Sequence, residues 1–484
     1  MDILIAGRGE IAARIARGAR EAGHRTIAVY TDPDTGAPHV GACDAAVYIG
    51  DAGGYLDSAC LLSAAAAAGA TAVHPGYGFL SENADFAQAV VDAGLTWIGP
   101  PSDAIRTMGD KMMARDAMAA AGVATVPGVH GTNLDEIAAL GFPVMIKAAN
   151  GGGGKGMRIA RNREELAAAL GDAASEAARA FGGGNVYAER LLEHARHVEV
   201  QVLADHYGNV IHLGERECSI QRRNQKIVEE APCTALNAGT RDAMCAAAVR
   251  AACAVGYRNA GTVEFLLAEN GMFYFLEMNT RIQVEHPITE LVWGVDIVAE
   301  QLRIAAGEPM SCLGAEPRGH AIECRIYAED PALGFLPSPG VVTHIHVPAG
   351  PGIRNDGSIV SGGTIPVNYD PLISKLIVHA PTRAEAISRM AHALTEYEVT
   401  GVATTIEYLR DVLAHPMFIA GNTPTDFLAR HLPDWQAPRA ADAAVIGAWA
   451  IARHVGQART QGAGKSGPAV PKTPWETLGS WGRS

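Results

Sequence analysis

Short apolar runs alternate with alanine-rich stretches along the first 110 residues of the chain. The apolar runs are typical of buried strands, and the alanine-rich stretches between them are typical of helices. This alternation predicts a doubly wound α/β arrangement around a parallel sheet, in other words a Rossmann-like domain. We expect its strands at Ile3–Ala6, Thr26–Tyr30, Ala45–Ile49, Ala70–Val73 and Thr96–Ile98.

The first turn of this region resembles a dinucleotide-binding fingerprint. Gly7-Arg8-Gly9-Glu10-Ile11-Ala12 fits G-x-G-x-x-[GA], and Asp32 follows at the end of the second strand. A nicotinamide-dependent enzyme is therefore one hypothesis. Two side chains count against it, because Arg8 is bulky where the backbone must approach a pyrophosphate and Glu10 places a negative charge at the helix N-terminus.

The segment from Ser58 to Ser81 has no charged residue, which raises the question of a membrane span. It consists mostly of alanine and glycine, and His74-Pro75-Gly76 interrupts it. A buried helix followed by a strand and a loop is the better prediction, and we expect no membrane association.

An Asn270-Gly271 pair between the apolar runs Thr262–Leu267 and Met272–Leu276 predicts a β-hairpin. If these two residues form the loop, Glu269 faces Met272. Continued along both strands, the same register places Glu264 directly opposite Glu277.

Two carboxylates opposed on one face of a sheet repel each other unless a cation lies between them. Asn279 lies two residues beyond Glu277, so its side chain is expected on the same face. Oxygen ligands of this kind, with positions left open for phosphate, suit Mg²⁺ or Mn²⁺. The alternative is a solvated hairpin face with two unpaired carboxylates.

If the strand stays extended beyond Asn279, then Arg281, Gln283 and Glu285 also point to this face. An acid for a metal, a cation for an anion and a free carboxylate as base then lie in one polar row. Such a row is typical of a catalytic surface.

A second candidate site follows the predicted strand Phe142–Lys147. The next residues, Asn150 to Gly156, contain five glycines, whose backbone N–H groups can curl around phosphates. A flexible surface loop is the alternative, but Lys147 and Lys155 beside the glycines favour an anion.

Beyond this loop, Glu189–Leu192 and the strand His197–Leu203 predict an antiparallel partner sheet. The basic run Cys218–Lys226 follows in an otherwise acidic protein. It is either a solvated face or a pocket for a substrate anion, and apolar residues on both sides make the pocket at least as plausible.

The chain changes character again after a Pro/Gly-rich join at residues 307–319. A strand at Ala321–Tyr327 opens a third unit, which ends in helices near Ala384–Leu394 and Thr404–Leu413. Beyond residue 435 only Ala441–Val455 predicts a helix, and Gln461–Thr473 is typical of a flexible linker.

The composition excludes some classes of function. The 484 residues carry a formal net charge of -13, which argues against nucleic-acid binding. The 8 cysteines show no metal-ligand spacing, and no signal peptide is visible, so we expect reduced thiols and a cytoplasmic location.

Taken together, these segments resemble the biotin carboxylases of the ATP-grasp superfamily over roughly residues 1–435. The motifs that carry the resemblance include Gly9–Ala12, His74–Asn83, Met108–Lys111, the glycine loop, Gln221–Lys226, the hairpin and Gly319–Arg325. The resemblance implies a Rossmann-like domain at 1–110, an ATP-grasp domain at 111–306 with a mobile lid at about 130–203, a mixed α+β C-terminal domain at 318–435, and a tail at 436–484.

The resemblance also implies the reaction, in which ATP and bicarbonate form carboxyphosphate and biotin is then carboxylated at its ureido nitrogen. The implied ATP ligands are Lys111, Lys147, Gly153, Gly154, Glu189, Leu192, His197 and Asn224, together with the metal ligands Glu264, Glu277 and Asn279. The implied residues for bicarbonate and biotin are Lys226, Arg281, Gln283, Val284 (through its backbone), Arg325 and Tyr77, with Glu285 as base and Arg325 stabilising the biotin enolate.

Three residues depart from the family pattern, namely Gly7, Asn150 and Asn224, which stands where histidine is frequent. The Met-Lys-Met acceptor of biotin is absent from the chain. Biotin is therefore expected on a separate carrier protein, with a carboxyltransferase subunit and a homodimer as further partners. The alternatives are another ATP-grasp ligase that forms a carboxylate or carbamate, and a non-catalytic nucleotide-binding subunit.

Overall fold

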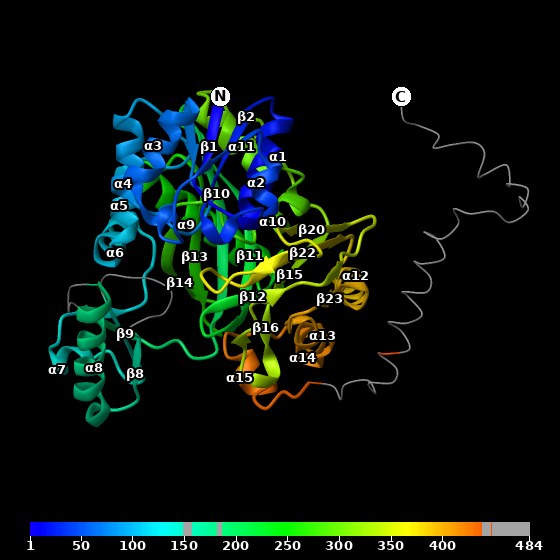
Figure 1. Cartoon of the computed structure of the whole chain (residues 1–484). Helices are drawn as coiled ribbons and strands as arrows, with labels where there is room; N and C mark the ends of the chain where they lie inside the picture. Colours follow the sequence, from blue (N-terminus) through cyan, green and yellow to red (C-terminus); the bar gives the residue numbers. More distant parts are fainter. Residues whose placement is uncertain (149–156, 182–185, 438–446, 448–484) are drawn as a thin grey trace, which may run out of the picture. The chain divides into compact units, whose positions relative to one another are not determined.

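A five-stranded parallel sheet begins the chain in the computed structural model, which describes residues 1–148, 157–181, 186–437 and 447 (Figure 1). The strand order β3-β2-β1-β4-β5 is that of a doubly wound sheet, so the predicted Rossmann-like arrangement is confirmed. The strands are β1 (Asp2–Ile5), β2 (Arg25–Tyr30), β3 (Ala45–Tyr48), β4 (Ala72–His74) and β5 (Thr96–Trp97). The helices beside them are α1 (Gly9–Glu21), α2 (Pro38–Ala42), α3 (Ser58–Ala68), α4 (Ala84–Asp92) and α5 (Ser102–Gly109).

Both faces of this sheet are covered, which explains why its central strand is an apolar run rather than an alternating one. Ile3 and Ile5 of β1 pack in one apolar cluster with Ile15 of α1. Leu4, which points to the opposite face, packs with Leu61 of α3 in another cluster. All of these side chains are buried.

The uncharged segment that follows residue 57 forms a helix, a strand and a loop, as predicted, but the helix is only partly buried, through Leu61, Ala64 and Ala65. Asp57 caps α3 by accepting a hydrogen bond from the Cys60 N–H at 3.0 Å. Gly69, with φ +66°, ends the helix in the left-handed conformation. No helix in the described part of the chain is long and apolar enough to cross a membrane.

An eight-stranded antiparallel sheet, in the order β14-β13-β10-β11-β12-β15-β22-β20, forms the largest element of the structure. The pairing of β12 with β15 makes it continuous across the join at residues 307–319, so the second and third expected units share one sheet. Its strands are β10 (Arg196–Ala204), β11 (Val210–Arg222), β12 (Gln225–Ala231), β13 (Asn259–Leu267), β14 (Phe273–Asn279), β15 (His320–Tyr327), β20 (Ile353–Gly357) and β22 (Leu372–Ala380).

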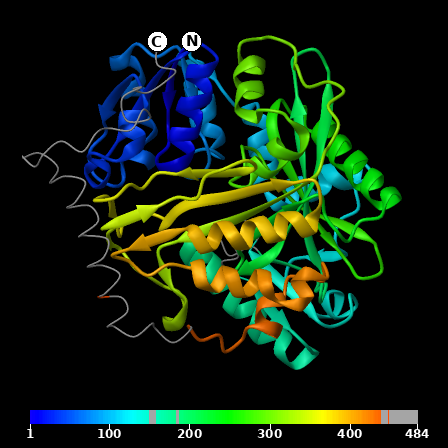
Figure 2. The ribbon, with the colours of Figure 1, turned by 90° about the vertical axis from the view of Figure 1, so that its right-hand side faces the viewer.

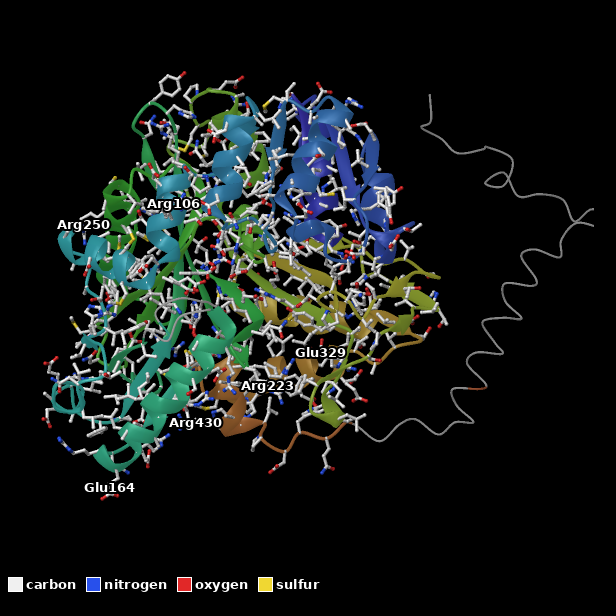
Figure 3. All side chains as sticks on the ribbon, turned by 60° about the vertical axis from the view of Figure 1, so that its left-hand side comes forward. Arg106, Glu164, Arg223, Arg250, Glu329 and Arg430 are labelled. Carbon is white, nitrogen blue, oxygen red and sulfur yellow. The ribbon has the colours of Figure 1, made fainter. Side chains whose placement is uncertain are left out.

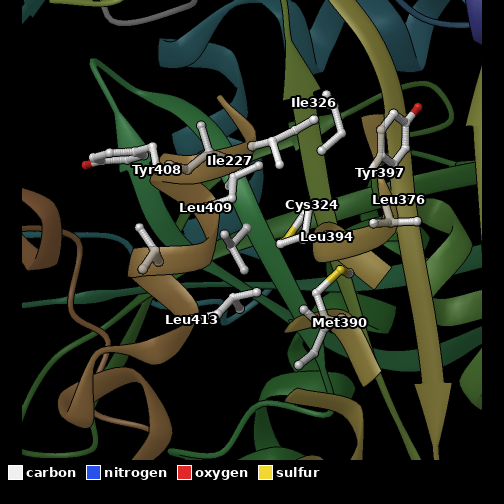
Figure 4. Packing of buried hydrophobic residues seen from close by; sticks show 14 of the residues in the cluster. Ile227, Cys324, Ile326, Leu376, Met390, Leu394, Tyr397, Tyr408, Leu409 and Leu413 are labelled. Atoms are coloured by element: carbon white, nitrogen blue, oxygen red, sulfur yellow. The ribbon is translucent and has the colours of Figure 1, made fainter. Parts of the chain in front are cut away.

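Helices cover this sheet. The helices α9 (Ala238–Ala254), α10 (His286–Trp293) and α11 (Ile297–Ala305) lie between its strands in sequence, and α12 (Arg383–Glu396), α13 (Ile406–Ala414), α14 (Pro416–Ile419) and α15 (Phe427–His431) follow them. Figure 2 shows the C-terminal helices (orange) along one face of the strands drawn in yellow. In the cluster drawn in Figure 4, Cys324 and Leu376 of the sheet pack with Met390 of α12 and Leu409 of α13.

The helix prediction near Ala384–Leu394 is confirmed, and the local reason for its start is visible. Thr382 accepts a hydrogen bond from the Glu385 N–H, and the Glu385 carboxylate accepts one from the Thr382 N–H. This capping box fixes the beginning of α12. The second helix predicted there, near Thr404–Leu413, is present as α13.

A separate four-stranded sheet, in the order β6-β9-β7-β8, lies at the lower left of Figure 1 with α7 and α8. Its elements are β6 (Gly128–His130), α7 (Leu134–Ala138), β7 (Val144–Ala148), β8 (Arg158–Ala160), α8 (Arg163–Phe181) and β9 (Val186–Arg190). It has an apolar core of its own, which includes Ile137, Val144 and Leu166. This layer ends with β9, because β10 belongs to the large sheet. The segments 189–192 and 197–203, for which an antiparallel sheet was expected, thus contribute to two different antiparallel sheets. The lid at about 130–203 stays a prediction, and β10 within it belongs to the large sheet.

Short elements complete the described chain. They are α6 (Lys111–Ala120), β16 (Glu329–Asp330), β17 (Leu336–Pro337), β18 (Gly340–Val341), β19 (His344–His346), β21 (Thr364–Ile365), β23 (Glu398–Thr400) and the 3₁₀ turns η1 (Asp32–Asp34), η2 (Gly54–Leu56) and η3 (Pro331–Leu333). Except for residue 447, which is helical, the segments predicted at Ala441–Val455 and Gln461–Thr473 lie outside the described residues.

The register of the β13–β14 hairpin differs from the predicted one near the loop but agrees with it at Glu264 and Glu277. The Ala268 N–H bonds to the Met272 carbonyl at 2.8 Å, so the loop has three residues, Glu269 to Gly271, and the two-residue loop is wrong. Gly271 takes the left-handed conformation that such a loop requires, with φ +80°. A bulge beyond Phe265 then inserts Leu276 and restores the register, so Glu264 does face Glu277.

Arg216 of β11 joins several elements inside the large sheet. Its guanidinium is fully buried and donates to Glu199 of β10 at 2.6 Å. It also donates to Gln201 at 2.8 Å, Thr262 of β13 at 3.0 Å and Thr289 of α10 at 2.9 Å. A buried cation is tolerated only when its charge and its donors are both satisfied, and Arg216 meets both conditions.

We predict that Arg216→Leu lowers the free energy of unfolding by roughly 3–5 kcal/mol, because the variant leaves buried acceptors without their donor. Urea unfolding followed by circular dichroism measures the change. Arg106→Ala is the matched control, since Arg106 (labelled in Figure 3) is exposed and forms an ion pair with the exposed Asp85. The control should change stability by less than about 1 kcal/mol. Equal effects of the two substitutions would contradict a structural role for Arg216.

Candidate functional site

One ammonium group gathers three carboxylates at the centre of the large sheet. Lys226, near the start of β12, lies 2.5 Å from Glu199, 2.9 Å from Glu264 and 2.6 Å from Glu285. Burial lowers the pKa of Lys226, but the three acids outweigh it and hold that pKa well above its usual value. The lysine is therefore a permanent cation, with β10, β13 and the start of α10 around it.

Glu199 was not among the residues singled out from the sequence. It lies opposite Glu264 in the pairing of β10 with β13, and it is fully buried. A signal was present, because His197, Glu199 and Gln201 alternate along a strand that is otherwise apolar. The same two-residue period that identified the hairpin acids would have found it.

The hairpin face carries the predicted metal ligands. Asn279 donates to Glu264 at 2.8 Å, and the His197 ring lies 3.0 Å from the same carboxylate. Burial raises the pKa of Glu264, but Lys226 and His197 outweigh it and hold that pKa well below the usual range.

Glu277 has the opposite shift. Burial, then Glu264 and Glu82, raise its pKa, while Lys111 and His197 offset only part of this effect. The described side chains thus leave an unbalanced negative charge beside Glu277. Carboxylate and amide oxygens are hard ligands, so Glu264, Glu277 and Asn279 fit Mg²⁺ or Mn²⁺.

The residues after Asn279 converge on the site, although they do not continue the strand. The strand β14 ends at Asn279, so the predicted extension to Glu285 is wrong. Arg281 turns back in the following loop and donates to Asn279 at 2.8 Å, to Gln283 at 3.1 Å and to Glu82 at 3.0 Å. Gln283 in turn donates to Glu264 at 3.0 Å. The acceptor Glu82 was not predicted from the sequence.

Glu285 and Arg325 meet at the start of α10. Glu285 precedes the first residue of this helix and is fully buried. One carboxylate oxygen faces Lys226, and the other accepts from Arg325 of β15 at 2.9 Å. Arg325 also donates to Glu229 of β12 at 2.6 Å. Burial raises the pKa of Glu285, but Lys226, Arg325 and Arg216 outweigh it and keep the carboxylate ionised.

Tyr77 links the N-terminal domain to this cluster. Its hydroxyl donates to Glu10 of α1, and Glu10 lies 3.2 Å from Lys375 of β22. Lys375 is fully buried and donates to the Val284 carbonyl at 2.8 Å. Lys375 was not predicted, although a lone lysine inside an apolar strand is an informative signal.

A second group of residues belongs to the separate sheet and its neighbours. The buried Lys147 of β7 forms an ion pair with Glu189 of β9, which also lies 3.4 Å from Arg115. Leu192 follows β9 and is half-buried. Lys111 begins α6, and burial lowers its pKa although Glu277 opposes the shift. Gly153 and Gly154 lie outside the described residues.

The basic run at residues 218–226 divides into two environments. Lys226 lies in the acid cluster, whereas Arg223 and Asn224 form the exposed turn between β11 and β12. Both turn residues have positive φ, +49° and +64°, and asparagine tolerates this conformation well. Asn224 makes no hydrogen bond to the acid cluster in the part of the chain that the structure describes. Figure 3 labels Arg223 at this turn.

The first turn of the chain has other partners than a dinucleotide. Arg8 bonds to Asp34 at 2.7 Å and lies 4.2 Å above the Tyr369 ring of the C-terminal region. Glu10 is part of the contact with Lys375 described above, and Asp32 accepts a hydrogen bond from Tyr48 at 2.6 Å. Arg8 and Glu10, through Tyr369 and Lys375, thus join the N-terminal domain to the C-terminal part of residues 1–435, whereas Asp32 and Asp34 bond within the domain.

Three family models match successive parts of the chain. They are the biotin carboxylase N-terminal domain at residues 1–105, the ATP-binding domain of the carbamoyl-phosphate synthase L chain at 110–313, and the biotin carboxylase C-terminal domain at 323–430. Together they follow the order of the structural units described above.

Relatives and solved structures agree with these matches. The chain is 51% identical to a biotin carboxylase from Nostoc sp. (88% of this chain, 98% of the relative) and 49% identical to one from Pseudomonas aeruginosa (89% and 98%). A biotin carboxylase structure from Campylobacter jejuni superimposes with a TM-score of 0.87 at 43% identity (89% and 98%).

A further structure is that of the biotin carboxylase domain dimer of the 2-oxoglutarate carboxylase from Hydrogenobacter thermophilus. It was determined with MgADP, ADP and bicarbonate, and it matches with a TM-score of 0.86 at 46% identity (90% and 99%). The chain belongs to the biotin carboxylases, the ATP-dependent ligases that its sequence resembles.

Proposed function

We propose that this protein uses ATP and bicarbonate to carboxylate biotin held on a separate carrier protein, as the first half-reaction of an acetyl- or acyl-CoA carboxylase. One observation carries the proposal at the level of residues. Lys226 contacts one oxygen of Glu285 and Arg325 contacts the other. A base, an anion-binding ammonium group and a guanidinium therefore share one buried site.

Lys226, Arg281, Gln283 and the Val284 backbone are the proposed bicarbonate site. Bicarbonate is a weak nucleophile, so a carboxylate that takes its proton and cations that hold the resulting charge both favour attack on the γ-phosphorus of ATP. Glu285 is ionised and fits the role of base. Its low pKa makes it a weak base while Lys226 and Arg325 both contact it. We therefore propose that bound bicarbonate attracts Lys226. The contact between Lys226 and Glu285 then weakens, and Glu285 becomes a stronger base.

Glu264, Glu277 and Asn279 would hold Mg²⁺ or Mn²⁺. When bound, this metal ion would neutralise charge on the phosphates of ATP. Gln283 and Arg281 orient two of these ligands through the hydrogen bonds described above, and His197 and Lys226 keep Glu264 ionised.

Arg325 is the proposed stabiliser of charge on the biotin ureido oxygen. A urea nitrogen becomes nucleophilic only if negative charge can build on that oxygen, which a preorganised guanidinium favours. Glu229 and Glu285 fix the guanidinium in place before any substrate binds. Tyr77 would line the same side of the site.

The proposed nucleotide ligands are Lys111, Lys147, Gly153, Gly154, Glu189, Leu192 and His197. The buried ion pair between Lys147 and Glu189 supports this assignment. When ATP binds, its phosphates can pair with the lysine, and the carboxylate is then available to accept a hydrogen bond from the adenine. Asn224 at the exposed turn is the weakest member, and we propose it only as a contact made once nucleotide is bound.

We propose a biotin carboxyl carrier protein and a carboxyltransferase subunit as partners, and a homodimer as the assembly. The dimeric Hydrogenobacter domain supports the homodimer, and the relatives named biotin carboxylase, of which this chain covers 98%, support a separate carrier protein. All 8 cysteines are unpaired, which agrees with a cytoplasmic location.

The alternative is an ATP-grasp ligase that forms a carbamate or another carboxylate, which the name of the middle family model would also allow. Arg325 discriminates between the two, since it lies outside the ATP-grasp unit and contacts the base. Stimulation of bicarbonate-dependent ATP cleavage by free biotin tests the proposal, and its absence would favour the alternative.

We predict that Glu277→Gln and Glu264→Gln both weaken Mg²⁺–ATP binding, measured by calorimetry, because each removes a carboxylate from a shared cation. Their effects on the metal-free protein should differ. Glu277→Gln relieves like-charge opposition and should raise the free energy of unfolding by up to about 1 kcal/mol. Glu264→Gln removes one of the three carboxylates that contact Lys226 and should lower the free energy of unfolding. A Glu277→Gln variant that melts well below the wild type would contradict the proposed repulsion.

We predict that Glu285→Gln binds Mg²⁺–ATP normally but loses bicarbonate-dependent ATP cleavage by about 10²–10⁴-fold, the usual contribution of a general base. Steady-state assays at saturating bicarbonate measure this loss. Glu308→Gln, at an exposed acid of the surface, is the control and should behave like the wild type. Normal turnover of Glu285→Gln would remove it from the role of base.

We predict that Arg325→Ala lowers carboxylation of free biotin by two to three orders of magnitude, roughly the cost of removing one preorganised charge stabiliser. ATP affinity, measured by calorimetry, should change little because Arg325 follows the ATP-grasp unit in the chain. An equal loss of ATP affinity would assign Arg325 to the nucleotide site instead.

A further inference from the structure

Two buried glutamates lie beside Arg325: Glu229, which binds its guanidinium, and Glu323, which has no part in the proposed reaction. The pairing of β12 with β15 places Glu229 directly opposite Glu323, and both side chains are fully buried. Their neighbours on these strands, Ala231 and Ala321, pack with Ile288 of α10 in an apolar cluster. The two carboxyl groups therefore lie on the same buried face of the sheet as the cluster that packs against α10.

The hydrogen bonds of this pair are incomplete. One oxygen of Glu229 accepts from Arg325 at 2.6 Å. The other oxygen of Glu229 and both oxygens of Glu323 are buried without a hydrogen-bond donor among the described residues. A buried carboxylate with no donor costs several kcal/mol, whereas a protonated carboxyl is itself a donor.

The cations near the two glutamates, Arg325 and Lys375, also contact other groups. Arg325 contacts Glu229 and Glu285. Lys375, which lies opposite Arg325 in the pairing of β15 with β22, donates to the Val284 carbonyl and lies 3.2 Å from Glu10. No ion pair joins Glu323 to a described cation. Two charged carboxylates opposed on this buried face would repel strongly, and a single proton removes the repulsion.

We infer that Glu229 and Glu323 form an acid–carboxylate pair that holds one proton and positions Arg325 against Glu285. Glu323 carries the proton and donates it to the free oxygen of Glu229, and Glu229 keeps the charge that binds Arg325. Glu323 is thus a positioning residue, which acts on the biotin step through Glu229 and Arg325. This assignment deepens the proposed function and rests on it for its catalytic consequence.

The electrostatic surroundings agree with this geometry. Burial raises the pKa of Glu323 well above its usual value, Lys375 opposes the shift, and Glu229 reinforces it. Burial also raises the pKa of Glu229, to about 7, against the effect of Arg325 and with that of Glu285. Since the two groups interact, their titration belongs to the pair and not to either residue alone.

His286 is the first residue of α10, the helix whose Ile288 packs with Ala231 and Ala321. It is fully buried, and burial, Lys375 and Arg14 hold its pKa well below the usual value, so it stays neutral. The charged groups that act on the pair are thus Arg325 of β15, Lys375 of β22, Lys226 of β12 and Glu285 before α10.

The first test needs no enzymatic activity. A carboxyl whose pKa is raised by folding contributes stability that is lost as the pH rises through the folded pKa. Glu323→Gln keeps a neutral donor at every pH, so its Tm relative to the wild type should rise between about pH 6 and pH 9. Infrared difference spectra at about pH 8 should show the carbonyl stretch of a protonated carboxyl in the wild type and not in Glu323→Gln.

Glu230→Gln is the matched control. Glu230 is the next residue of β12, is also buried, and is held ionised by Arg383 at 2.6 Å and His320 at 2.8 Å. Its substitution should lower the Tm by an amount that stays constant over the alkaline half of this range, and it should remove no protonated carboxyl from the spectrum. A Tm difference for Glu323→Gln that is independent of pH, or no protonated carboxyl in the wild type, would overturn the inference.

The second test measures the catalytic consequence. Loss of the shared proton adds a second charge behind Arg325 and draws the guanidinium from Glu285, so biotin carboxylation by the wild type should fall at alkaline pH. In Glu323→Gln this fall should move up by at least about one pH unit, while Glu323→Leu, which cannot donate, should lose about tenfold at all pH values. An unchanged pH profile in Glu323→Gln would overturn the positioning role.

The two proposals fail in different ways. A wild type without biotin-stimulated ATP cleavage would overturn the proposed function, while the infrared and Tm measurements would still decide whether the pair holds a proton. Normal cleavage together with a negative infrared result would overturn only the acid–carboxylate pair.

Discussion

The contact of Lys226 with three buried carboxylates is the interaction on which the site depends. Each of Glu199, Glu264 and Glu285 comes from a different element, and each would be costly to bury without a cation. The lysine makes their assembly possible. In return the acids keep it charged in a place where burial alone would favour its neutral form. The fold and the proposed chemistry therefore rest on the same charges.

The large sheet provides the rigid support for this arrangement. Its central strands β10, β11, β12 and β13 carry Glu199, Arg216, Lys226 and Glu264, and cross-strand pairing fixes the spacing of their side chains. The strand β15 adds Arg325 from the C-terminal part of the chain without a break in the hydrogen-bonded ladder. Residues from both parts of the chain can thus meet with little freedom, which is the condition for electrostatic preorganisation.

A second chain of charges ties the N-terminal domain to the same place. Glu10 of α1 accepts a hydrogen bond from Tyr77 and forms an ion pair with Lys375. Lys375 also donates to the carbonyl of Val284, one residue before Glu285. Glu10 is also one of the two side chains of the first turn that count against a dinucleotide site. Here Glu10 serves the contact between domains, which gives a physical reason why a negative charge stands at this helix N-terminus.

The sequence by itself determined the elements and much of the chemistry. Apolar runs located all five strands of the parallel sheet, and their alternation with helices predicted a doubly wound arrangement, whose strand order the structure then supplied. The opposition of Glu264 and Glu277 was also predicted correctly, although the loop is one residue longer than expected and a bulge at Leu276 compensates for it. Both features follow from local rules, because backbone geometry and the two-residue period of a strand act over a few residues.

The tertiary structure alone decided which distant charges meet. The sequence of a single strand shows only that it carries a polar residue at a buried position. This is the case for Glu199, Glu229, Glu323 and Lys375, and their neighbours in the fold come from other strands. The same is true of Arg281, which reaches Asn279 through a loop and not along the predicted strand. Long-range pairing sets these contacts, and the cost of burying each charge depends on the partner that the fold brings to it.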